Sequence, residues 1–153
     1  MGSSVENTDS MNATFIHLTI LWWELEIEWQ IRRKHGASLA DPLFPSDSET
    51  YATAREKVEA DLADLRSRAG GTFPLEQVIQ THNLDRAESQ ILTLALMPLL
   101  DLSFRNRLAR YNNNILFDYV DVDLALRLLF PDQRTERLQA RALFSDDARL
   151  VTE

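Results

Sequence analysis

One apolar run limits what this chain can fold into. Residues 91–100, ILTLALMPLL, include the polar Thr93 and the helix-breaking Pro98. The run is only about half as long as the roughly 20-residue segment that crosses a membrane as a helix, so we exclude a membrane anchor. Asp85 and Glu88, just before the run, have capping-box spacing and predict the start of a helix. The sequence therefore predicts a helix that is buried on most of its surface and that Pro98 ends or kinks.

The composition restricts the partners and the chemistry of the chain. Its 153 residues suit one compact domain. The absence of cysteine excludes disulfides, thiolate metal sites and cysteine nucleophiles, and it suits a reducing compartment, so we expect a cytoplasmic protein. The formal net charge of -8 repels a phosphate backbone at long range. Nucleic acid is therefore a disfavoured partner.

The N-terminal part of the chain predicts a tail and then a long helix. Residues 1–12 have no basic region leading into an apolar one, and their Ser and Asn content predicts a disordered tail. Between residues 13 and 35, apolar side chains form two stripes at helical spacing, which predicts a helix covered on two sides. The i,i+4 spacing of Glu24, Glu28 and Arg32 predicts an exposed, ion-paired edge of this helix.

A second helix completes a predicted hairpin over residues 13–70. Gly36 can take the left-handed conformation that ends the first helix. Ser46 and Glu49 have capping-box spacing, so we expect the second helix to begin there. It is expected to stop at the two consecutive glycines, residues 70–71.

Residues 71–145 predict a winged-helix-like domain. A short strand at Thr72 and Phe73 precedes three helices, and the β-branched and aromatic residues 115–120 predict a strand after them. Asp121 then caps a further helix. This order of elements is typical of a winged helix. The predicted fold class is mainly α, with an N-terminal helical hairpin followed by a winged-helix-like domain with a small β wing, both packed as one globular unit.

No pattern in the sequence predicts catalysis. The four glycines, at positions 2, 36, 70 and 71, form no phosphate-binding loop. No two of the three histidines stand three or four residues apart, as zinc ligands on one helix would. The carboxylates of Asp118, Asp121 and Asp123 lack the glycine and the terminal glutamate of a calcium loop. We therefore expect a chain that is not an enzyme and that has no catalytic residue, no metal ligand and no cofactor-binding residue.

Five residues are candidates for contact with a partner. Arg105, Arg107 and Arg110 lie on the predicted helix 103–111, which contains no acidic residue and has the place of a recognition helix. They make a small winged-helix DNA-binding regulator the alternative function. Trp22 and Trp23 are adjacent on the first helix, and a chain of this size need not cover both. The exposed apolar patch that would result is typical of a protein-interaction site.

Three segments, LDRAESQILTLALMPLLD, FRNRLARY and VDLALRLLF, resemble the N-terminal winged-helix domain of a group of bacterial AAA+ ATPases. This group includes the ATPases associated with phage-tail-like contractile injection systems. The family's Leu-Ser/Asp-x-x-Glu start is matched by Leu84, Asp85 and Glu88, and its Pro-containing turn is matched by Pro98, Leu100 and Asp101. The chain departs from the family at Leu99, where the family has an acidic residue.

The resemblance implies a noncatalytic domain that docks a substrate or partner protein and packs on the ATPase ring of its own parent protein. Residues 146–153 would begin a connector to an ATPase module that follows residue 153. ATP and Mg²⁺ would be bound by that module and not by this chain. Docking by protein contacts is the first functional hypothesis, and DNA binding is the alternative.

Overall fold

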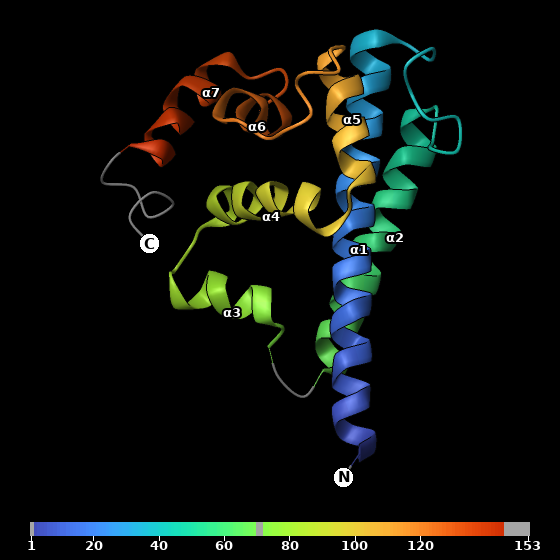
Figure 1. Ribbon diagram of the computed structural model, residues 1–153, viewed down its shortest axis with the longest axis vertical. Helices are drawn as coiled ribbons and strands as arrows, with labels where there is room; N and C mark the ends of the chain where they lie inside the picture. Colours follow the sequence, from blue (N-terminus) through green and yellow to red (C-terminus); the bar gives the residue numbers. More distant parts are fainter. Residues whose placement is uncertain (1, 70–71, 146–153) are drawn as a thin grey trace. The chain divides into compact units, whose positions relative to one another are not determined.

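The computed structural model describes residues 2–69 and 72–145, with side chains from Thr8 onward. This part of the chain is mainly helical, as predicted, and contains no β-strand (Figure 1). The elements are, in chain order, α1 (Gly2–His35), α2 (Ser48–Arg68), α3 (Pro74–Thr81), α4 (Arg86–Leu100), α5 (Ser103–Asn112), α6 (Val122–Leu129), α7 (Arg134–Ala140) and the 3₁₀ helix η1 (Arg141–Phe144). They divide into two compact units, residues 1–77 and residues 78–153, with the boundary inside α3.

In the first unit, α1 and α2 pack against each other as an antiparallel hairpin (Figure 1). The aromatic ring of Phe15 on α1 stacks on that of Phe73, with 4.4 Å between the ring centroids. The buried core of the hairpin consists of Phe15, Leu25, Val58, Leu62, Leu65 and Phe73. Because these apolar side chains recur at helical spacing on both helices, their burial stabilises the pairing of α1 with α2.

Helix α1 begins at Gly2, so residues 2–12, which we predicted to be part of a disordered tail, are helical in the structure. No proline interrupts this segment, and Met11 packs against the hairpin core. The contact made by Met11 explains why the helix continues past the predicted start at residue 13, since tertiary packing stabilises helices more than propensity does.

The ends of the hairpin helices follow local capping rules. Gly36 has φ +81°, and its N–H donates to the carbonyl of Arg32 at 2.9 Å, so the predicted left-handed cap of α1 is confirmed. Helix α2 begins one residue later than the predicted capping box. Its N-cap is Asp47, not Ser46, and the Asp47 Oδ1 accepts the Thr50 N–H at 2.8 Å.

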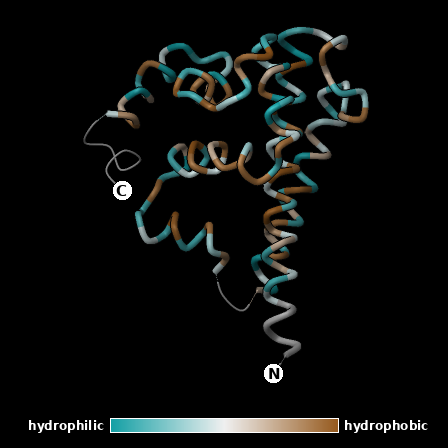
Figure 2. Tube along the Cα trace, viewed as in Figure 1, coloured by the Kyte–Doolittle hydropathy of each residue, from teal (hydrophilic) through white to brown (hydrophobic). Residues whose placement is uncertain are grey.

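In the second unit, α4 contacts α5 and α6, and α6 also contacts α7 and η1. Hydrophobic residues recur along α4 (Figure 2). The buried apolar side chains of these helices are Ile91, Leu94 and Met97 of α4, Phe104, Leu108 and Tyr111 of α5, and Leu124, Ala125, Leu126 and Leu128 of α6. Ile91, Leu94 and Met97 are buried as predicted, but α4 is not buried on most of its surface, because Ala95, Leu99 and Leu100 are exposed.

The start and end of α4 are set by side chains near it in sequence. Asp85 accepts the Glu88 N–H at 2.8 Å, and Glu88 accepts the Asp85 N–H at 2.8 Å, which confirms the predicted capping box. Pro98 lies in the last turn, and α4 ends two residues later at Leu100. Asp101 then accepts the backbone N–H of Ser103 at 2.9 Å at the start of α5.

The predicted small β wing is not confirmed. Residues 115–120 form a loop, and residues 72–73 belong to neither a helix nor a strand. A strand needs a neighbour that pairs with its N–H and C=O groups. In the loop, the Phe117 carbonyl instead accepts a hydrogen bond from the side-chain amide of Asn112 at 2.8 Å.

None of the helices in the described part of the chain is both long and apolar enough to span a membrane.

Candidate functional site

The three arginines predicted as a DNA-binding set lie on α5 of the second unit. Arg105 forms an ion pair with Asp118, with 2.8 Å between the guanidinium and carboxylate atoms. Arg110 donates from Nε to the Asn106 Oδ1 at 3.2 Å. The Nε of Arg107 is shielded from solvent. The Arg105–Asp118 ion pair offsets a positive charge that a phosphate contact would require.

The segment after α5 begins with a left-handed turn. Asn113 has φ +50°, and its N–H donates to the carbonyl of Arg110 at 3.1 Å. The N–H of Asn114 donates to the carbonyl of Ala109 at 3.0 Å, and the Asn114 side chain accepts the Leu116 N–H at 3.0 Å. Asparagine tolerates the left-handed conformation and bonds to nearby backbone, so this sequence ends the helix and starts a loop.

Two side chains of α5 contact this loop, and one of them also bonds to α6. Asn112 donates to the Phe117 carbonyl, and its Oδ1 accepts a hydrogen bond from Arg127 of α6 at 3.2 Å. Asp118 is held by Arg105 of α5. The Arg127 guanidinium also lies 5.5 Å from the Tyr111 ring centroid. The side chains of Asn112 and Arg105, both of α5, therefore hold the loop.

We call residues 113–121 the α5–α6 loop, and its exposed apolar side chains the apolar tip. The tip consists of Ile115, Leu116, Phe117 and Tyr119, of which Ile115 is 84% and Leu116 is 76% exposed. Phe117 and Tyr119 meet edge to face, with 6.2 Å between their ring centroids. The loop contains two aspartates and no lysine or arginine. Sequence reasoning missed this surface, because the β-branched and aromatic residues that form it also predict a strand.

The two tryptophans predicted to contact a partner lie on α1 of the first unit. Trp23 is 3% exposed. Trp22 is half-buried, and its Nε1 donates to the Glu59 Oε1 of α2 at 3.1 Å. The Arg55 guanidinium lies 4.8 Å from the Trp22 ring centroid. Trp22 thus has partners on α2, and a role of either tryptophan in binding another protein stays a prediction.

A polar cluster joins α1 to α2 beside these tryptophans. The Tyr51 hydroxyl donates to Glu26, and Arg55 pairs with the same carboxylate at 3.3 Å. The Tyr51 ring stacks on Trp29, with 4.7 Å between the centroids. Burial, together with the hydrogen bond to Glu26, raises the pKa of Tyr51 above its ordinary value. Tyr51 therefore stays protonated at neutral pH and acts as a hydrogen-bond donor in the hairpin.

One glutamate that we predicted at an exposed edge of α1 is buried. Glu28 is 1% exposed, and its Oε2 accepts the backbone N–H of Asp41 at 2.8 Å. The α1–α2 connection returns to α1 at this point, which the spacing of residues within α1 does not reveal. The carboxylate is thus part of the structure of the hairpin turn.

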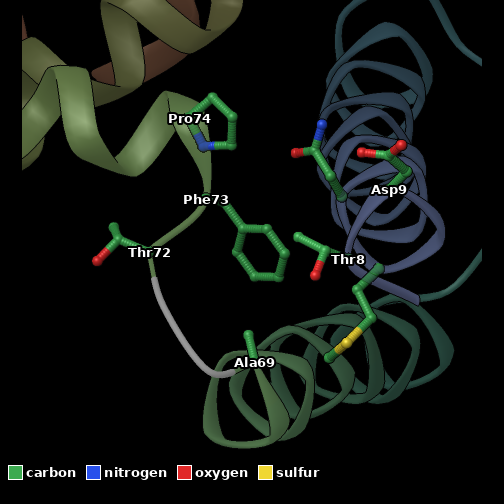
Figure 3. Close-up of a pocket in the computed structure, with 8 residues that line it drawn as sticks. Thr8, Asp9, Ala69, Thr72, Phe73 and Pro74 are labelled. Carbon is green, nitrogen blue, oxygen red and sulfur yellow. The ribbon is translucent and has the colours of Figure 1, made fainter. Parts of the chain in front are cut away.

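The first unit also contains an open cavity of about 430 Å³ beside the first turns of α1 (Figure 3). Its apolar lining consists of Met11, Ala69, Phe73 and Pro74, and its polar lining consists of Thr8, Asp9, Asn12 and Thr72. The Phe73 ring projects toward the segment of α1 that carries Thr8 (Figure 3). We did not predict this cavity from the sequence, because half of its lining comes from residues that we had placed in a tail.

A comparison with family models decides which family the chain belongs to. The model described as "Winged helix domain, variant" matches residues 28–153, which is most of the chain. The chain belongs to this winged-helix family. No curated protein and no solved structure matches the chain.

Within residues 8–69 and 72–145, no three Cys, His, Asp or Glu side chains gather closely enough to hold a metal ion. The surfaces that remain as candidates are the basic side of α5, the apolar tip and the cavity of the first unit.

Proposed function

We propose that this winged-helix domain is a noncatalytic docking domain that binds another protein through the apolar tip. The observation that carries the proposal is the nature of the α5–α6 loop. Ile115 and Leu116 are almost fully exposed in the segment that we predicted as the wing, where a DNA-binding winged helix needs basic side chains. A protein partner would remove these side chains from water, which favours association by about 25 cal/mol for each Å² of apolar surface buried.

The parent protein that we propose is a cytoplasmic AAA+ ATPase. Support comes from the resemblance of residues 84–101 and 122–126 to the N-terminal domain of such ATPases, including those of contractile injection systems. In this proposal the domain binds a substrate or an assembly component and packs on the ATPase ring of its parent. ATP and Mg²⁺ are bound by the ring, so the domain itself needs no cofactor.

The reading frame provides the first test of the proposed parent. We expect the codons after residue 153 to encode a glycine-rich phosphate loop that ends in Lys and Ser or Thr. A stop codon directly after residue 153, with no ATPase gene beside it, would contradict the proposed parent while leaving the docking proposal open to its own test.

The docking proposal is tested by substitution in the apolar tip. We expect Leu116→Ser to weaken binding to the ATPase ring, or to a protein encoded beside it, by about tenfold or more, as the loss of an interface anchor does. The matched control is Leu138→Ser, because Leu138 is also an exposed leucine of the second unit but lies outside the loop. Isothermal titration calorimetry measures both. Equal affinities for the two variants and the unmodified chain would contradict docking through the tip.

A second candidate function, DNA binding, rests on the arginines of α5. The Arg105 side chain is 53% exposed although it pairs with Asp118, so a competing phosphate has access to it. Against this candidate stand the formal net charge of -8 and the lack of a basic residue in the α5–α6 loop. We therefore rank DNA binding below protein docking.

A further inference from the structure

We propose that the cavity beside the start of α1 binds a lysine or arginine side chain of the docked protein. This inference rests on the proposed docking function and adds a second contact, on the first unit, to the one made by the apolar tip. The chemistry, the charge and the surroundings of the eight residues that line the cavity suit such a side chain.

The cavity combines an apolar floor with polar groups at its rim. Phe73, the most buried of the apolar lining residues, is 4% exposed and is held in place by its stacking on Phe15. Asp9 and Thr8 are exposed, and both come from the first turns of α1 that the structure describes (Figure 3). Long basic side chains match this arrangement, because they bury their methylene stems against apolar surface while the charged end stays near water.

The negative charge of Asp9 favours a cation as the ligand of the cavity. Asp9 is the one ionisable residue among the eight lining residues. Among the described residues, no Lys, Arg or His side chain pairs with its carboxylate. Asn12 and Thr72 add oxygen atoms that can accept further hydrogen bonds from an ammonium or guanidinium group. The lining of the cavity therefore includes a carboxylate, an amide and a hydroxyl that can accept hydrogen bonds from a cationic group.

Arg66, a basic residue of the hairpin near this region, already has an acidic partner. Arg66 forms an ion pair with Glu76, and its guanidinium lies 5.5 Å from the centroid of the Phe15 ring that stacks on Phe73. Because Glu76 compensates its charge, Arg66 does not neutralise Asp9. Residues 1–77 contain 13 acidic and seven basic residues, so the first unit also attracts cations at long range.

The volume of the cavity fits one side chain with its neighbouring backbone. About 430 Å³ lies within the range of roughly 300 to 1,000 Å³ that is typical of small-ligand pockets. The cavity is open to solvent, so a residue on the surface of a docked protein can enter it without an opening motion of the hairpin.

The test uses amino-acid amides as probes and the chain of residues 1–153 labelled with ¹⁵N. We expect Nα-acetyl-lysinamide or Nα-acetyl-argininamide to shift the amide resonances of Asn12, Thr72 and Phe73 in a saturable manner. Nα-acetyl-norleucinamide, which has an apolar side chain in place of the ammonium-bearing one, is expected to bind at least about tenfold more weakly, as the loss of a charge-assisted hydrogen bond implies.

Two variants separate a specific site from general charge attraction. Asp9→Asn removes the carboxylate of the cavity, and we expect it to weaken binding of the basic probe by about tenfold. Glu56→Gln removes one negative charge from an exposed position of α2 that does not line the cavity, and we expect it to leave binding unchanged. Far-ultraviolet circular dichroism confirms that both variants keep their helices.

Three results would overturn the inference: no saturable shift with either basic probe, equal binding of norleucinamide, or equal weakening by Asp9→Asn and Glu56→Gln. The outcome is independent of the test made with Leu116. If Leu116→Ser weakens docking while the probes do not bind, the docking function stands and this cavity is not part of it. If the probes bind while Leu116→Ser has no effect, the proposed role of the apolar tip fails instead.

Discussion

At the scale of single residues, the capping box of α4 links sequence to stability most directly. Asp85 and Glu88 exchange two hydrogen bonds, and Glu88 is 3% exposed. We expect Asp85→Ala to lower the free energy of unfolding by about 1–2 kcal/mol, because the Glu88 N–H loses its acceptor. Asp85→Asn, which keeps a side-chain oxygen, is expected to cost less. Urea denaturation followed by circular dichroism measures both losses, and a larger loss for Asp85→Asn would contradict this account.

The cap of α2 predicts a pH effect. Hydrogen bonds from the Thr50 backbone and hydroxyl lower the pKa of Asp47 below its ordinary value. Since the folded state holds this proton less tightly than the unfolded state, the stabilisation is present above the ordinary pKa and is lost as the pH falls through the lowered value. Carboxyl ¹³C NMR should give a midpoint below the ordinary value for Asp47. Thr50→Val, which removes only the hydroxyl bond, should raise that midpoint, and an unchanged midpoint would contradict the assignment.

Residue patterns predicted contacts within a helix better than contacts across the chain. The Asp85–Glu88 box and the Gly36 cap follow from neighbours in sequence, and both were predicted. Glu28 was predicted to be exposed because only its position on α1 was considered. Its burial depends on the backbone of Asp41, which a pattern confined to α1 does not include.

At the scale of elements, the α5–α6 loop shows why β propensity is a weak guide. Residues 115–120 have a strand-like composition, but propensity reflects packing on a sheet that must already exist. Here the side chains of Asn112 and Asn114 bond to the loop backbone instead. The asparagines at 112–114 were a sequence signal for a turn, and they determine the loop conformation.

Replacing leucine by alanine is expected to lower the free energy of unfolding only slightly in the loop and much more in α5. Leu116 is 76% exposed, so we expect Leu116→Ala to change the free energy of unfolding by less than about 0.5 kcal/mol. Leu108 of α5 is 0% exposed, and Leu108→Ala is expected to cost about 2–5 kcal/mol because it leaves a cavity. Chemical denaturation measures the pair. Similar losses for both leucines would mean that the apolar tip is packed and is not available to a partner.

At the scale of the whole molecule, hydrophobic periodicity predicted a mainly helical chain, and the order of the elements together with the family resemblance predicted the winged-helix class. The family match from residue 28 to residue 153 includes α2 and part of α1, so the hairpin is largely within the family's domain. The sequence did not predict the unit boundary inside α3 or the helical start of α1. The unit boundary and the helical start of α1 both depend on which segments pack together. A pattern of neighbouring residues does not predict such packing.

The distribution of charge also belongs to this scale. Residues 1–77 carry 13 acidic and seven basic residues, whereas residues 78–153 carry 11 acidic and nine basic residues. Most of the negative charge is therefore in the first unit, and the second unit, which contains α5, is closer to neutral. Neither unit has the excess of basic residues that is typical of a DNA-binding domain.

The central claim is that this winged-helix domain contacts protein and not nucleic acid. Its most direct test is the fluorescence anisotropy of a labelled random-sequence duplex, titrated with the chain at an ionic strength of about 0.15 M. We predict binding no tighter than the weak non-specific range, roughly 10⁻⁴ M, and no change when Arg105, Arg107 and Arg110 are all replaced by alanine. Tighter binding that falls steeply with added salt and is abolished by the triple substitution would contradict the claim.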